Sequence, residues 1–175
     1  MYSLIKMVLM EVQKTALKYG IFTGVVLIIY FLLLSLVGLH QNAVFSFVNV
    51  LITGTGIYLA IQKLKRIEKE EFRYQFGFAA GIVTGFTATV IFTLFSILYI
   101  TELNPNFTQS FMTEWELDWF AGNGMLLLTI FLMGLATTVV LTLAFMQLFK
   151  DSWNTIEGSK HTLSKHNNVK SKKRN

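Results

Sequence analysis

Three long stretches of this chain contain no Asp, Glu, Lys or Arg. They cover residues 19–62, 74–101 and 119–149, and they are rich in Leu, Ile, Val and Phe. A helix needs about 20 apolar residues to cross the hydrocarbon core of a bilayer, so the first stretch has room for two crossings and the others for one each. A membrane barrel would show short alternating segments instead, so the pattern predicts four transmembrane helices.

The first stretch must contain a turn, and its only polar cluster is His40-Gln41-Asn42, just after Gly38. We therefore expect a tight turn there and an all-α, integral membrane four-helix bundle occupying residues 19–156. The four spans are expected at about residues 20–39, 43–61, 76–100 and 125–149.

The two ends of the chain have different patterns. Residues 1–18 carry apolar side chains at helical spacing, which predicts a short cytoplasmic interfacial helix. A cleavable signal peptide is disfavoured because no small-residue cleavage site follows. Residues 157–175 are polar and basic, which is typical of a disordered tail. The apolar positions of the first segment are Leu4, Ile5, Val8, Leu9, Val12 and Ala16.

All 15 Lys and Arg residues fall in three places, which are residues 1–18, 63–73 and 150–175. The turn at His40 has none, and the link at residues 101–121 carries only acidic charge. Because short cytoplasmic flanks retain Lys and Arg, we expect a bacterial inner-membrane protein with both termini in the cytoplasm. An odd number of spans would place a cationic flank on the opposite side.

The amino-acid composition further limits the kinds of protein that fit this chain. The chain is 53% hydrophobic and 14% charged, whereas soluble domains average about 25% charged residues. It has no cysteine, which excludes a disulfide scaffold and a thiolate metal site. The basic tail is suited to anionic lipid headgroups on the cytoplasmic face. Nucleic acid is disfavoured as a partner, because the charge is that of any cytoplasmic flank.

The expected spans contain no Asp, Glu, Lys, Arg or His, which disfavours a proton-coupled carrier or an ion channel. The deepest polar group is Asn49, with Thr53 one turn further on. Asn49 could contact a substrate, but a hydrogen bond to a neighbouring helix, worth about 1 kcal/mol, is the interpretation we favour.

Catalytic chemistry would need a nucleophile with a base, paired acids, or His and carboxylate ligands near the membrane. The sequence offers no such cluster. We therefore expect no enzyme activity, catalytic residue, cofactor or metal ion, although a site assembled between subunits stays open.

Glycine recurs at fourfold spacing, at Gly20 and Gly24 in the first span and at Gly77, Gly81 and Gly85 in the third. Small residues at this spacing form a groove where another helix backbone can approach closely. We favour helix packing within the monomer over dimerisation as the use of these grooves.

Residues 18–24 align with residues 75–81 through an aromatic residue and both glycines, each at the start of an odd-numbered span. This alignment allows the chain to be two helical hairpins related by a parallel repeat. Transporters with such repeats hold their substrate between the halves.

The link after the third span places Phe111, Trp115 and Trp119 at positions i, i+4 and i+8. This spacing predicts a short amphipathic helix on the outer leaflet. We favour simple anchoring over a lid or a partner-docking surface.

The chain resembles a family of small four-span membrane proteins of Bacteroidetes-type bacteria, known as a domain of unknown function. The resemblance rests on Lys18-Tyr19-Gly20, on Tyr74-Gln75-Phe76-Gly77-Phe78-Ala79-Ala80-Gly81, and on Tyr99 followed by Asn104-Pro105-Asn106-Phe107. It covers about residues 11–157. It implies no activity, cofactor or catalytic residue.

The sequence thus predicts a non-enzymatic packing or assembly partner, working through its glycine faces and its outer amphipathic helix. The alternative is a small transporter or channel for an uncharged or lipophilic solute, formed between the hairpins or between subunits. The expected partners are the lipid bilayer and either a second copy of the chain or another membrane protein.

Overall fold

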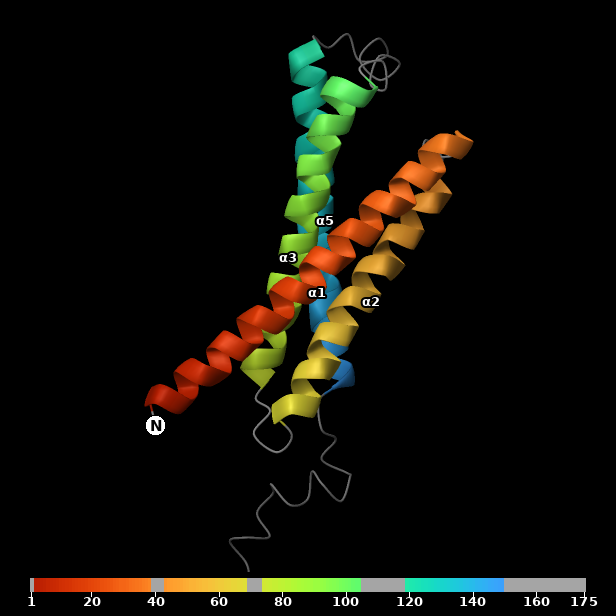
Figure 1. Cartoon of the computed structure of the whole chain (residues 1–175). Helices are drawn as coiled ribbons and strands as arrows, with labels where there is room; N and C mark the ends of the chain where they lie inside the picture. Colours follow the sequence, from red (N-terminus) through yellow and green to blue (C-terminus); the bar gives the residue numbers. More distant parts are fainter. Residues whose placement is uncertain (1, 39–42, 69–73, 105–118, 150–175) are drawn as a thin grey trace, which may run out of the picture.

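The computed structural model describes residues 2–38, 43–68, 74–104 and 119–149. Within these ranges the chain is all-helical (Figure 1). The helices are α1 (Tyr2–Val37), α2 (Ala43–Glu68), α3 (Tyr74–Leu98), the π-helical turn η2 (Tyr99–Leu103) and α5 (Trp119–Leu148).

Four of these helices are long and apolar enough to cross a membrane. The qualifying segments are Met10–Val37, Phe47–Ile67, Tyr74–Leu103 and Gly122–Leu148. The predicted all-helical architecture with four helices of membrane-spanning length is therefore confirmed. The turn predicted near His40 begins at Gly38, whose φ of 74° suits glycine. Residues 39–42 lie outside the described ranges.

The first helix differs from the prediction. We expected an interfacial helix at residues 1–18 followed by a separate span, but α1 continues from Tyr2 to Val37 without a break. Val12 and Ala16, expected on the membrane surface, are instead buried against Leu64 of α2 and Ala80 of α3. An apolar stripe has the same spacing whether lipid or protein covers it, so periodicity could not separate the two cases.

The helices form two hairpins, α1 with α2 and α3 with α5 (Figure 1). The hairpins cross at an angle, so that their upper ends diverge in this view. Helix α3 lies at the centre and contacts the other three long helices. Its buried residues from Gly77 to Ser96 are all Gly, Ala, Thr or Ser, which lets its neighbours approach closely.

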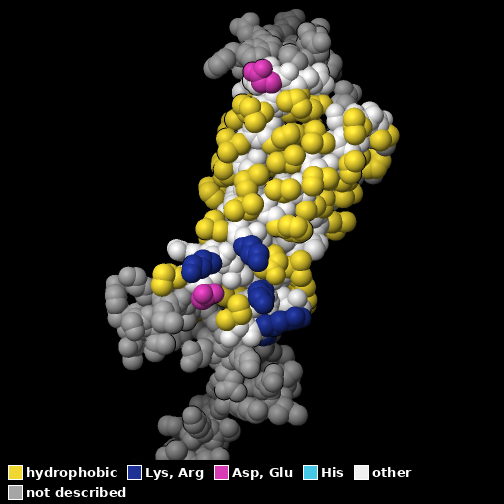
Figure 2. Space-filling model, viewed as in Figure 1, with side chains coloured by type: hydrophobic (Ala, Val, Ile, Leu, Met, Phe, Trp, Pro, Cys, Tyr) yellow, Lys and Arg dark blue, Asp and Glu magenta, His cyan; other side chains and the backbone are white. Residues whose placement is uncertain are grey.

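The outer surface of the helices is apolar. Large side chains such as Phe22 and Phe47 are 65% and 72% exposed. Figure 2 shows hydrophobic side chains over the middle of the molecule, with the described Lys and Arg side chains gathered below them at one end. An exposed apolar band of this extent, bounded by charge, is typical of a surface that contacts lipid.

Candidate functional site

The glycines of α1 lie where it crosses α3. A Cβ atom on Gly20 would lie 2.8 Å from the carbonyl oxygen of Thr84, and one on Gly24 would lie 3.0 Å from Cβ of Ile91. The close approach of the two helices allows the hydroxyl of Thr84 to donate a hydrogen bond of 3.2 Å to the carbonyl oxygen of Ala16. The α1 glycines are therefore occupied by a helix of the same chain.

The glycines of α3 lie against α5. A Cβ atom on Gly81 would lie 2.6 Å from Cγ2 of Thr142, and one on Gly85 would lie 2.9 Å from Cβ of Thr138. Both threonines are fully buried, at 0% and 1% exposure. Gly77 is also buried on α3. All five glycines that the sequence singled out are thus buried at helix faces.

The aligned glycines of the two candidate repeats have different neighbours. Gly24 faces Ile91, which belongs to the other hairpin, whereas its counterpart Gly81 faces Thr142, which belongs to the same hairpin. Aligned positions therefore do not make equivalent contacts.

Sequence reasoning passed over one close approach on α2. A Cβ atom on Gly56 would collide with the side chain of Thr23 on α1. The signal that could have found it is Thr53-Gly54-Thr55-Gly56, a run of small residues within a span.

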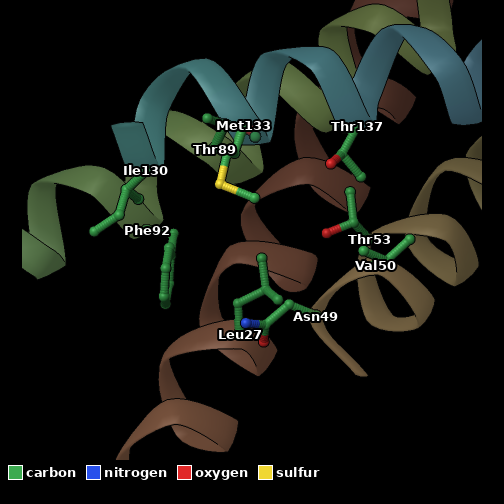
Figure 3. Close-up of a pocket in the computed structure, with 10 residues that line it drawn as sticks. Leu27, Asn49, Val50, Thr53, Thr89, Phe92, Ile130, Met133 and Thr137 are labelled. Carbon is green, nitrogen blue, oxygen red and sulfur yellow. The ribbon is translucent and has the colours of Figure 1, made fainter. Parts of the chain in front are cut away.

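A cavity of about 210 Å³ lies between the two hairpins. All four long helices contribute to its wall (Figure 3). Leu27, Thr89 and Gly134 lie within a turn of the midpoints of the apolar segments of α1, α3 and α5. The lining residues are Leu27, Asn49, Val50, Thr53, Thr89, Phe92, Ile130, Met133, Gly134 and Thr137.

Asn49 and Thr53, which the sequence singled out, line this cavity together. The oxygen Oδ1 of Asn49 is buried and has no hydrogen-bond partner among the described residues. The favoured interpretation, a hydrogen bond to a neighbouring helix, is thus not what the structure shows at this atom. Leaving a buried acceptor unpaired costs about 1–3 kcal/mol.

Two further threonines on the wall, Thr89 and Thr137, were not anticipated. Figure 3 shows the hydroxyl oxygens of Thr53 and Thr137 pointing into the space between Met133 and Asn49. The cavity therefore combines apolar walls with a few polar groups, a composition typical of small-molecule sites.

A second cavity, of about 240 Å³, lies between α1 and α2 within one hairpin. The hydroxyl groups of its two threonines are already paired. Thr23 donates to the carbonyl oxygen of Tyr19 at 2.7 Å, and Thr55 donates to that of Leu51 at 2.8 Å. This cavity offers less for a polar ligand group to bind than the cavity at Asn49.

Beyond the cavity, α1 and α3 are joined by an aromatic cluster and a hydrogen bond. The rings of Phe31 and Tyr99 meet edge to face with centroids 4.9 Å apart, and Phe31 makes similar contacts with Phe92 and Phe95. The hydroxyl groups of Ser35 and Tyr99 are 2.7 Å apart. The helix ends at Leu103, just before Asn104.

Charged side chains lie toward the helix ends. Lys65 of α2 donates a hydrogen bond of 3.2 Å to the carbonyl oxygen of Phe149, just after α5, and lies 5.8 Å from the centre of its ring. This contact ties the two hairpins together at the cationic end. Within the described ranges, no group of three His, Cys, Asp or Glu residues could hold a metal ion.

The predicted outer amphipathic helix falls mostly outside the described ranges, which include neither Phe111 nor Trp115. Trp119 is the first residue of α5 and is therefore continuous with the fourth apolar helix.

Residues 18–118, more than half of the chain, match the family model described as "Protein of unknown function (DUF4199)". The chain belongs to this family. The predicted membership of a domain of unknown function is thereby confirmed. The DUF4199 match includes Asn49, Thr53 and Thr89 and ends before α5. Comparisons with curated proteins and with solved structures gave no match.

Proposed function

We propose that this DUF4199 protein is a non-enzymatic, multi-pass protein of a bacterial inner membrane that binds a small uncharged or lipophilic solute between its two hairpins. The observation that carries this proposal is the cavity at Asn49, which is walled by both hairpins. Small-molecule sites commonly lie between the helices of a bundle. Binding between the hairpins is the first step that a small transporter or channel requires.

The membrane placement is supported by the distribution of charge. Lys14 and Lys18 precede the charge-free part of α1, residues 19–37, and Lys63, Lys65 and Arg66 lie near the end of α2. Figure 2 shows the described cations at one end of the molecule. With four crossings, both termini and the link at residues 69–73 lie in the cytoplasm under the positive-inside rule.

A role as an assembly partner through the glycine faces has less support. Gly20, Gly24, Gly81 and Gly85 are occupied by helices of the same chain, so a partner could not use these grooves without separating them. The exposed face of α5, with Leu132 among its side chains, needs only lipid to cover it.

Topology can be tested directly because the chain contains no cysteine. Lys69→Cys and Thr108→Cys would be treated with a membrane-impermeant maleimide in intact cells. We expect labelling at position 108 and none at position 69 until the cells are opened. Labelling of position 69 in intact cells would overturn the proposed topology.

Solute binding can be tested by photolabelling the full chain in lipid nanodiscs. The probes are two eight-carbon diazirines, one ending in a hydroxyl and one in a methyl group, with adducts mapped by mass spectrometry. We expect saturable labelling of Thr53 and Thr89, whose side chains are buried.

The variant Thr137→Phe should fill the cavity and abolish this labelling. Its matched control is Thr129→Phe, two turns away on α5, where the side chain is exposed and its hydroxyl bonds its own helix. Labelling that is non-saturable, spread over lipid-facing residues and unaffected by Thr137→Phe would refute solute binding.

A further inference from the structure

We infer that the ligand of this cavity is a neutral alcohol, an aliphatic chain ending in a hydroxyl group that pairs with the side-chain amide of Asn49. The inference rests on the proposed function and adds the chemical class of the solute.

The amide of Asn49 determines the polar part of the ligand. An asparagine amide carries one acceptor oxygen and two N–H donors, and here the oxygen is buried without a partner among the described residues. A hydroxyl group both donates and accepts, so it can pair with either end of the amide. If the amide is rotated so that its oxygen and nitrogen exchange places, a hydroxyl group on the ligand can still pair with it.

The ligand must be uncharged because the wall has nothing to compensate a charge. None of the 10 described residues that line the cavity is ionisable. The cavity also lies near the middle of three apolar segments, where an ionised group is strongly disfavoured. A carboxylate or an ammonium group would therefore remain in the headgroup region.

The rest of the wall fits an aliphatic chain. Leu27, Phe92 and Ile130 supply apolar surface around the amide. A cavity of about 150 Å³ holds benzene, so one of about 210 Å³ has room for roughly eight heavy atoms. Val50 and Met133 also reach the molecular surface, at 38% and 65% exposure. A longer chain can therefore continue between α2 and α5 into the lipid.

The geometry separates this site from the cavity between α1 and α2. There, both lining threonines, Thr23 and Thr55, already donate to carbonyl groups of their own helices, and no buried side-chain atom of the described lining residues lacks a hydrogen-bond partner. We therefore assign the alcohol to the cavity between the hairpins.

The test is competition against the hydroxyl-bearing diazirine probe, with the full chain in nanodiscs. The competitors are 1-octanol and octyl methyl ether, with their concentrations in the lipid measured. The ether accepts hydrogen bonds but cannot donate them. We expect 1-octanol to compete about fivefold better, which corresponds to one hydrogen bond, and we expect Asn49→Leu to abolish the difference.

The Asn49→Leu variant should fold, because it replaces an unpaired amide by an apolar side chain of similar size. Its circular dichroism and thermal midpoint would be recorded first. Asn49→Ser, which keeps a hydroxyl in the wall, should retain part of the preference for the alcohol.

The outcomes separate the two claims. Equal competition by alcohol and ether, with no effect of Asn49→Leu, would overturn the inference while solute binding stands. The inference would also be overturned if alcohol and ether competed equally well in the unmodified protein and neither competed in Asn49→Leu. The amide would then act only as a hydrogen-bond donor. If neither competitor reduces labelling and Thr137→Phe has no effect, the proposed function itself fails.

Discussion

Replacing Gly85 by alanine tests the close packing of α3 against α5. The new methyl group would lie 2.9 Å from Cβ of Thr138 and closer still to both branches of its side chain. Thr138 is 1% exposed and, being β-branched, has few alternative rotamers. Either the two helices separate, or Thr138 turns and loses its hydrogen bond of 2.8 Å to the carbonyl oxygen of Gly134.

The expected magnitude follows from two opposing terms. Alanine is favoured over glycine in a helix by about 1 kcal/mol. Forcing a methyl group into a filled interface costs about 1–3 kcal/mol. We therefore expect Gly85→Ala to lower the free energy of unfolding by about 1 kcal/mol. Gly124→Ala is the matched control, because a Cβ atom there meets nothing within 4 Å, and it should raise that free energy by up to about 1 kcal/mol.

The assay is SDS-induced unfolding in mixed micelles, followed by circular dichroism. Adding Thr138→Ala to Gly85→Ala removes the blocking side chain, so the pair should be less destabilised than the sum of the single changes. The reasoning fails if Gly85→Ala is as stable as Gly124→Ala, or if the two changes at the interface are additive.

Three further predictions can be tested by the same unfolding assay. Thr84→Val removes a hydrogen bond between helices and should lower the free energy of unfolding by about 0.6–1 kcal/mol. Thr138→Val removes a hydrogen bond within one helix and should lower it by less than about 0.5 kcal/mol. Equal effects of the two changes would contradict this reasoning. Ser35→Ala should cost about 1 kcal/mol and Tyr99→Phe at least as much, because the Tyr99 hydroxyl also accepts from Asn104. The two changes together should cost less than their sum, because they share one hydrogen bond; additive losses would contradict that sharing. Asn49→Leu should stabilise the ligand-free protein by about 1 kcal/mol, and a loss of stability would show that its amide is paired.

The four apolar helices could be predicted because the bilayer leaves few alternatives. A backbone in hydrocarbon must satisfy its own hydrogen bonds, so a charge-free stretch of about 20 residues forms a helix. The length of α1 could not be predicted in the same way. Whether Val12 and Ala16 face lipid or Leu64 depends on where α2 and α3 lie, and local periodicity does not contain that information.

The candidate site was predictable in part. Fourfold glycine spacing identified the close-packing faces, and Asn49 stood out as a polar residue within an apolar span. Their partners could not be predicted, because spacing along one helix does not specify the helix opposite. Thr89 and Thr137 were passed over, since threonine is common in membrane helices and only the crossing of the hairpins brings these two to one cavity.

Val50 and Met133 line the cavity and are exposed on the apolar surface of the helices. If the proposed alcohol site opens there, the bilayer is the reservoir that supplies the alcohol. Occupancy then follows the mole fraction of alcohol dissolved in the membrane. Each added methylene improves partitioning by about 0.8 kcal/mol, which is about fourfold in apparent aqueous affinity without any new protein contact. The apparent affinities of a homologous series of alcohols would therefore follow their solubility in lipid. Selectivity by the protein would become visible only after each affinity is divided by the partition coefficient of that alcohol.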